Sequence, residues 1–248
     1  MWDMLSETVI WAVAWTVAAT AFLWHSGRSW TSSTPDDVLN VNLMHTVVGT
    51  LVGLHFLIYY GAEIADDPMR AHIPSVVALT HITTGYILVD LALVMLGRHW
   101  DMFQYALFHV LILGAYGLYL VHGTGVAGVA VGTAGEVCVL GIHGTRIFRG
   151  WGWDEDRQHA YLIWQTATAG GMVVCKIFGL GWVALSGAQD VWVNGLGHSM
   201  VVTFQTVICT VGLLMNVQIC WSWSFVIDEW RYQIAVWQHQ RAQKDKAT

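Results

Sequence analysis

Seven long apolar stretches run through this 248-residue chain, and they restrict what it can fold into. They cover residues 7–24, 42–61, 73–96, 102–121, 123–145, 159–185 and 197–227. Each approaches or exceeds the ~20 residues that a helix needs to cross the ~30 Å hydrocarbon layer of a membrane. We therefore predict an all-α fold: a polytopic membrane helical bundle with about seven transmembrane helices.

The positive charges support seven crossings. With seven, the face that holds the C-terminus collects Arg28, Arg98, Arg146, Arg149, Arg157, Arg231, Arg241, Lys244 and Lys246. Of the eleven lysines and arginines, only Arg70 then lies on the other face, and Lys176 lies inside a stretch. Short basic loops stay on the cytoplasmic side of a membrane or its equivalent. We therefore expect the C-terminus inside and Met1 outside; six or eight crossings would scatter these charges.

The composition leaves no room for a soluble domain, because 55% of the residues are hydrophobic and only 11% are charged, against a usual quarter. We expect an N-terminal transmembrane helix and loop over 1–37, a helical bundle over 38–232 and a polar, basic tail over 233–248. Glycines cluster in 123–145, which predicts a helix deep inside the bundle. The net charge of −6 argues against nucleic acid as a partner.

Polar side chains inside the apolar stretches predict the position of a site. An ionisable group at a helix centre in lipid costs at least ~2.5 kcal/mol, so it normally turns inward and finds a partner. The candidates are His45, His81, Tyr86, Asp90, His109, Glu136, His143, Lys176 and Asn216. We predict that they converge on a cavity that would hold an acyl chain or a whole phospholipid. Taken singly, each also fits a structural role, such as a histidine bonded to a carbonyl group.

The spacing of these residues supports a shared cavity and excludes some sites. Tyr86 and Asp90, four apart, share one helix face, as do Glu136 and His143, seven apart. The carboxylates Asp90 and Glu136 stay ionised together in a dry core only if Lys176 or a protonated histidine balances them. No HExxH or CxxC pattern occurs, so we expect no metal site and no disulfide framework.

Four segments carry a family resemblance. They are Thr83–Tyr86 with Asp90, Trp100–Phe103 with Phe108 and His109, Gly135–Arg146, and Leu213–Asn216 with Trp221. In this order they resemble the TLC family, which includes the ceramide synthases, and His45 resembles a family histidine near the start of the domain. The resemblance covers about residues 38–232. It implies a lipid-facing membrane bundle whose C-terminal tail is cytosolic.

The chain departs from the ceramide synthases at one position. Those enzymes carry two adjacent histidines, whereas here Phe108 replaces the first and only His109 remains. Phenylalanine can neither accept nor relay a proton, and acyl transfer needs a base or nucleophile held by a second polar group. We therefore predict a non-catalytic integral membrane protein, either a lipid-binding scaffold or an accessory subunit of a larger membrane protein complex.

Two alternatives stay open. An acyl-CoA-dependent lipid acyltransferase, like a ceramide synthase, would use His109 as base or acyl acceptor and Asp90 to orient it. A lipid sensor would exchange a bound lipid without turnover and so regulate membrane composition. In each case membrane lipids are partners, and for a scaffold other membrane-protein subunits are as well. TLC relatives are mostly in the endoplasmic reticulum, and the charge distribution fits the mitochondrial inner membrane equally.

Overall fold

The computed structural model describes residues 2–194 and 200–247, and helices joined by short loops make up its regular secondary structure there. The elements are α1 (Trp2–His25), η1 (Trp30–Ser32), α2 (Pro35–Asp66), α3 (Pro74–Leu96), η2 (Trp100–Met102), α4 (Phe103–His122), α5 (Val126–Ala134), α6 (Glu136–Gly150), α7 (Trp153–Asp156), α8 (Gln158–Gly171), η3 (Met172–Phe178), α9 (Gly179–Asn194), α10 (Met200–Ser222) and α11 (Phe225–Ala247). Two short elements, η1 and η2, are 3-10 helices, and η3 is a π-helix.

Seven segments are long and apolar enough to cross a membrane, which confirms the predicted all-α membrane bundle. They are Ser6–His25, Pro35–Asp66, Pro74–Leu96, Trp100–His122, Val126–Gly150, Gln158–Asn194 and Met200–Val236. The last two contain 37 residues each, or about 56 Å of helix at 1.5 Å per residue, which exceeds the ~30 Å hydrocarbon layer. Residues 197–199, the predicted start of the seventh stretch, lie outside the described residues.

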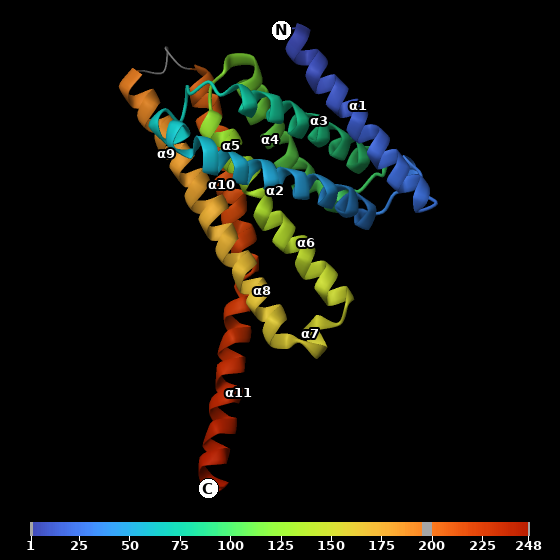
Figure 1. The fold of residues 1–248 in the computed structure, drawn as a ribbon, viewed down its shortest axis with the longest axis vertical. Helices are drawn as coiled ribbons and strands as arrows, with labels where there is room; N and C mark the ends of the chain where they lie inside the picture. The colour runs from blue at the N-terminus through green and yellow to red at the C-terminus, as the bar shows by residue number, and fades with distance from the viewer. Residues whose placement is uncertain (1, 195–199, 248) are drawn as a thin grey trace.

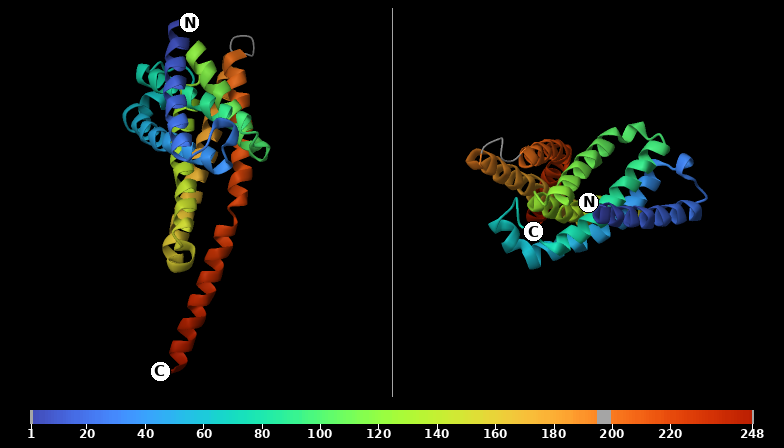
Figure 2. Two further views of the ribbon diagram at one scale, coloured as in Figure 1. Left: turned by 90° about the vertical axis from the view of Figure 1, so that its right-hand side faces the viewer. Right: turned by 90° about the horizontal axis from the view of Figure 1, so that it is seen from above.

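The helices form an upper bundle from which two features extend in the same direction (Figure 1). One is the hairpin made by α6, α7 and α8, and the other is α11, which leaves the bundle and ends far from the N-terminus. The side view in Figure 2 shows the same separation. The segment that the sequence predicts as a polar tail, 233–248, is thus the second half of a helix as far as Ala247.

Contacts at the two ends of the bundle agree with seven alternating crossings. At one end, Arg28 pairs with Asp37 at 2.7 Å and Arg146 with Asp36 at 3.5 Å, so both cations lie at the start of α2. At the other end, Arg70 pairs with Asp190 at 2.6 Å, which joins the α2–α3 loop to α9. Arg70 is therefore separated from the cations that the sequence places on the other face.

The start of α2 is fixed by its own side chains. Thr34 caps the helix: its hydroxyl oxygen accepts from the Asp37 backbone N–H, and the Asp37 carboxylate accepts from the Thr34 N–H at 2.7 Å. Pro35 follows at the first helical position, where its missing N–H costs nothing. The ion pair between Arg28 and Asp37 then ties the α1–α2 loop to this cap.

Glycines bring α2 against the middle of the chain. A Cβ atom built on Gly53 would lie 2.4 Å from the Ala134 Cα, and one on Gly49 would lie 2.8 Å from the Glu136 Cγ. Small residues four apart allow helices to approach this closely. Most of α5 is buried, as the glycine pattern predicts, and the α-helix is interrupted at Gly135 between α5 and α6.

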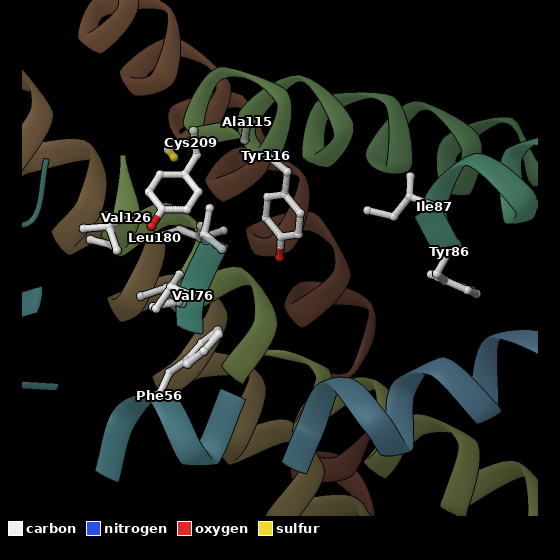
Figure 3. Close-up of a cluster of buried hydrophobic side chains, with 14 of the residues drawn as sticks. Phe56, Val76, Tyr86, Ile87, Ala115, Tyr116, Val126, Leu180 and Cys209 are labelled. Atoms are coloured by element: carbon white, nitrogen blue, oxygen red, sulfur yellow. The ribbon is translucent and has the colours of Figure 1, made fainter. Parts of the chain in front are cut away.

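An apolar core lies between α4, α5, α9 and α10. Figure 3 shows Ala115 and Tyr116 of α4 near Leu180 of α9 and Cys209 of α10. Tyr116 is 3% exposed, and its hydroxyl group lies 3.1 Å from the Thr133 hydroxyl of α5. This core forms one wall of the polar region described next.

Candidate functional site

A cavity of about 230 Å³ lies between α2, α4, α6, η3 and α10. Five of the sequence-predicted residues line it: His109, Glu136, His143, Lys176 and Asn216. The rest of the lining is Leu39, Asn42, Tyr105, Phe108, Ile112, Cys138, Val139, Ile142, Arg146, Met172 and Ile219. Helices from both halves of the chain thus place polar groups around one largely apolar hollow.

His109 is held through both of its ring nitrogens. Its Nδ1 lies 2.9 Å from the carbonyl oxygen of Tyr105, and because a carbonyl group only accepts, Nδ1–H is the donor. Its Nε2 lies 3.1 Å from Oδ2 of Asp90, which is fully buried. This is a close contact between the imidazole and the carboxyl group, and neither Asp90 oxygen has a hydrogen bond of good geometry among the described residues. The hydroxyl groups of Tyr86 and Tyr105 lie close to the same carboxyl group.

Behind this pair, aromatic rings close the site on the side of α1. The rings of His45 and Tyr86 stack with centroids 3.7 Å apart and planes 3° apart. Trp15 of α1 meets the His45 ring edge-on at 6.0 Å. Both His45 nitrogens are buried and lack a hydrogen-bond partner among the described residues. His45 therefore contributes packing here, and the N-terminal helix supplies part of the wall.

Asn42 connects three of the predicted residues. Its amide Nδ2 donates to the Tyr86 hydroxyl oxygen at 2.5 Å, and its Oδ1 accepts from His143 Nε2 at 2.8 Å. The Thr46 hydroxyl lies 3.2 Å from the same Oδ1 and 3.3 Å from the Glu136 carboxylate. Because Nε2 of His143 carries the donated proton, its Nδ1 is an acceptor when the ring is neutral.

Lys176 is a buried lysine that has no anionic partner among the described residues. Its side chain comes from the π-helix η3 and is 5% exposed. No carboxylate of the described residues lies within 4 Å of its ammonium group, and Glu136 contacts Thr46 instead. The Nζ atom lies 5.7 Å from the centre of the Phe108 ring. Phe108 thus gives Lys176 a cation–π contact.

The two remaining predicted residues differ in their surroundings. Asn216 lines the cavity, and its Nδ2 donates to the Gly212 carbonyl group at 2.8 Å. His81 does not line the cavity. It contacts Thr8 at 2.7 Å and Glu7 at 3.6 Å, both on α1. The physical reason is helical periodicity, since His81 and Asp90 are nine positions apart, which is about 180° around a helix.

Several site residues are absent from the sequence prediction: Trp15, Asn42, Thr46, Tyr105 and Arg146. Two of them could have been found from spacing, because Tyr105 lies four residues before His109 and Arg146 lies three after His143. Its place between two apolar stretches predicts a basic loop for Arg146. Its guanidinium group contacts Asn40, near the start of α2, and reaches the cavity lining.

Among the described residues, no three His, Cys, Asp or Glu side chains are grouped as metal ligands would be. Comparisons with protein families, with curated proteins and with solved structures find no match for this chain. What the site does is therefore argued from its own geometry.

Proposed function

We propose that this integral membrane protein has a TLC-like fold and binds a lipid acyl chain in the cavity without turning it over. In this role it is a lipid-binding scaffold or an accessory subunit of a membrane protein complex. The observation that carries the proposal is the position of His109, whose Nδ1 bonds the Tyr105 carbonyl group and whose Nε2 faces Asp90.

A general base must present a free nitrogen to the proton that it removes. Both ring nitrogens of His109 face other groups of the protein, Nδ1 the Tyr105 carbonyl group and Nε2 the Asp90 carboxyl group. A ligand in the cavity would have to displace one of these groups before it could reach a nitrogen of His109. The neighbouring position, Phe108, cannot replace it. The polar groups facing the ligand are then Asn42, His143 and Lys176, which suit the binding of a head group more than the chemistry of acyl transfer.

The outer parts of the molecule support a role beside a partner. α11 extends away from the bundle (Figure 1), and Trp230 ties its first half to α8 by donating to Thr166 at 2.6 Å. The second half of the helix carries Arg241, Lys244 and Lys246. We propose that this half contacts another membrane-protein subunit, and that the membrane is that of the endoplasmic reticulum or the inner membrane of mitochondria, with the C-terminus inside.

The test is purification of the full chain in a mild detergent, followed by native mass spectrometry and an assay with radiolabelled acyl-CoA. We expect about one lipid per chain and no acyl transfer above a boiled sample. Ile142→Trp, which fills the cavity lining, should remove the lipid, while Ile163→Trp on the exposed surface of α8 should retain it. A chain that folds, is free of lipid and has no cavity-dependent binding would overturn the proposal.

An acyltransferase is the second candidate, and the contact of 3.1 Å between Asp90 and His109 favours it, because a carboxylate can orient a catalytic imidazole. This mechanism requires His109 to turn away from the Tyr105 carbonyl group when substrate binds. Turnover of labelled acyl-CoA by the wild type and its loss in His109→Ala, with lipid binding retained, would establish the enzyme. Equal turnover in both would exclude this mechanism.

A further inference from the structure

Lys176 is a buried cation that has no anionic partner among the described residues. Lys176 lies at the midpoint of the span Gln158–Asn194 and is 5% exposed. An ammonium group at membrane depth is costly unless something pairs with it. The other charged groups of the cavity do not provide this pairing. Glu136 is bound to Thr46, and Asp90 faces His109.

The charged groups that line the cavity favour an anion. They are Lys176, Arg146 and Glu136, two cations against one carboxylate, and Asp90 is not among the lining residues. Asp36, which pairs with Arg146, is 81% exposed and lies outside the cavity. An anionic group next to Lys176 would therefore balance the charge within the hollow.

The same lysine borders a second, apolar cavity. This smaller hollow, of about 40 Å³, shares Phe108, Ile112 and Lys176 with the larger one. Lys176 is its only charged side chain. The other lining residues are Leu111, Ala115, Tyr116, Gly128, Gly132, Leu180, Ile208, Cys209 and Gly212. Figure 3 shows four of them, Ala115, Tyr116, Leu180 and Cys209, within the apolar core.

We propose that the bound lipid is a single-chain amphiphile whose anionic head group, a carboxylate or a phosphate, pairs with Lys176, and whose first methylene groups contact the apolar cavity. This inference rests on the proposed lipid-binding function. The size of the larger cavity argues for one chain, since about 230 Å³ is below the ~300–1,000 Å³ of common ligand pockets. His143 and Asn216 line the same cavity and can contact further oxygens of the head group.

Three probes with the same chain test the head group: hexadecanoate, hexadecyl phosphate and hexadecanol, each titrated into the purified full chain. Wild type should bind at least one anion about tenfold more tightly than the alcohol, since a charge-assisted hydrogen bond is worth that factor. The tighter anion identifies the head group. Lys176→Gln should reduce the preference to within about twofold, whereas Lys176→Arg, and Lys244→Gln in α11, should retain it.

The outcomes separate the two proposals. Equal binding of all three probes by wild type would overturn the pairing with Lys176 and leave lipid binding intact. No binding of any probe would overturn the proposed function itself. If Lys176→Gln does not fold, as judged by gel filtration and thermal unfolding, Lys176→Arg still decides. Loss of the anion preference in this folded, charge-conserving variant would also count against the pairing.

A second variant tests the position of the chain. Gly212 lines the apolar cavity, and a Cβ atom there would meet only Leu180, at an ordinary 3.9 Å. Gly212→Leu should therefore fill the hollow and weaken the binding of hexadecanoate about tenfold, roughly the contribution of two buried methylene groups, with the anion preference unchanged. Gly117→Leu on α4, where a Cβ atom meets nothing within 4 Å, is the matched control. Unchanged binding of hexadecanoate by Gly212→Leu would place the chain elsewhere.

Discussion

At the scale of single residues, the fully buried Asp90 is the clearest case of a polar group that needs its partner. Its carboxyl group lies 3.1 Å from His109 Nε2, and neither carboxyl oxygen has a hydrogen bond of good geometry with the described residues. Removing one member of such a pair leaves the other desolvated and uncompensated, which typically costs about 3–5 kcal/mol. Removing both members leaves an apolar gap instead.

We therefore expect the two substitutions to be non-additive. Asp90→Leu and His109→Phe should each lower the free energy of unfolding by about 3 kcal/mol, and the double variant should lose at least about 1 kcal/mol less than their sum. Thermal and denaturant unfolding in detergent would measure this. Glu7→Gln, at the 60%-exposed carboxylate beside His81, should have little effect. Additive losses at Asp90 and His109 would show that the contact is not a coupled pair.

The residue scale also shows how far a candidate site can be predicted from the sequence. The high free energy of a charge in lipid identifies buried ionisable residues. Four of the predicted ones, His109, Glu136, His143 and Lys176, do line the cavity. The same criterion cannot separate His81 from Asp90, because which face of α3 turns toward α1 depends on tertiary packing. It also overlooks Asn42, a neutral amide that costs less to bury and yet contacts both Tyr86 and His143.

At the scale of elements, close packing of α2 on α5 shapes the cavity. Gly53 faces the Ala134 backbone, where a Cβ atom would lie 2.4 Å from the Cα. Gly61, on the same helix, has nothing within 4 Å of such an atom. Replacing each glycine by alanine therefore measures two different effects in the same helix: the steric cost of a Cβ atom at Gly53, and the gain in helix propensity at Gly61.

We expect Gly53→Ala and Gly61→Ala to change stability in opposite directions. Overpacking should cost about 1–3 kcal/mol at Gly53, whereas alanine should stabilise by about 0.5–1 kcal/mol at Gly61 because it is the better helix former. The midpoints of thermal unfolding in detergent would report both changes. A neutral or stabilised Gly53→Ala variant would mean that α2 and α5 do not approach as closely as described.

The apolar stretches predict where the helices are, since burial in lipid requires both length and hydrophobicity. They do not predict the end of α5 at Ala134, the π-helix Met172–Phe178 or the continuation of α11 to Ala247. The end of α5 and the π-helix alter the hydrogen-bond pattern of the backbone, while the residues around them stay equally hydrophobic. In the third, a polar sequence remains helical outside the membrane, and a hydropathy pattern contains no signal for that.

Truncation tests what α11 does. A chain ending at Val236 keeps Trp230 and its bond to Thr166 and removes the part of the helix that extends from the bundle. We expect the midpoint of thermal unfolding to change by less than about 2 °C, because the removed residues lie outside the packed bundle. Cross-linking of the full chain to a neighbouring subunit in native membranes should be lost in the truncated chain. Equal cross-linking would place the partner surface on the bundle.

At the scale of the whole molecule, charge and topology together predict how the chain is inserted. Seven spans put the termini on opposite faces, and the contacts of Arg70 with Asp190 and of Arg28 with Asp37 lie at opposite ends of the bundle. Basic residues are retained on the inside during insertion. Nine of the eleven lysines and arginines lie on the C-terminal face in this topology. The excess of positive charge on that face therefore remains large when a few of these residues are neutralised.

We predict that an epitope at the N-terminus is protected from protease in sealed endoplasmic reticulum microsomes and that an epitope at the C-terminus is digested. Neutralising Arg241, Lys244 and Lys246 together should leave this pattern unchanged. The remaining cations on the C-terminal side still outnumber Arg70, which is the one lysine or arginine that the sequence places in a loop on the opposite side. Detergent, which opens the vesicles, should expose both epitopes. Protection of both epitopes in intact vesicles, or digestion of both, would require an even number of crossings, and the reverse pattern would invert the proposed orientation.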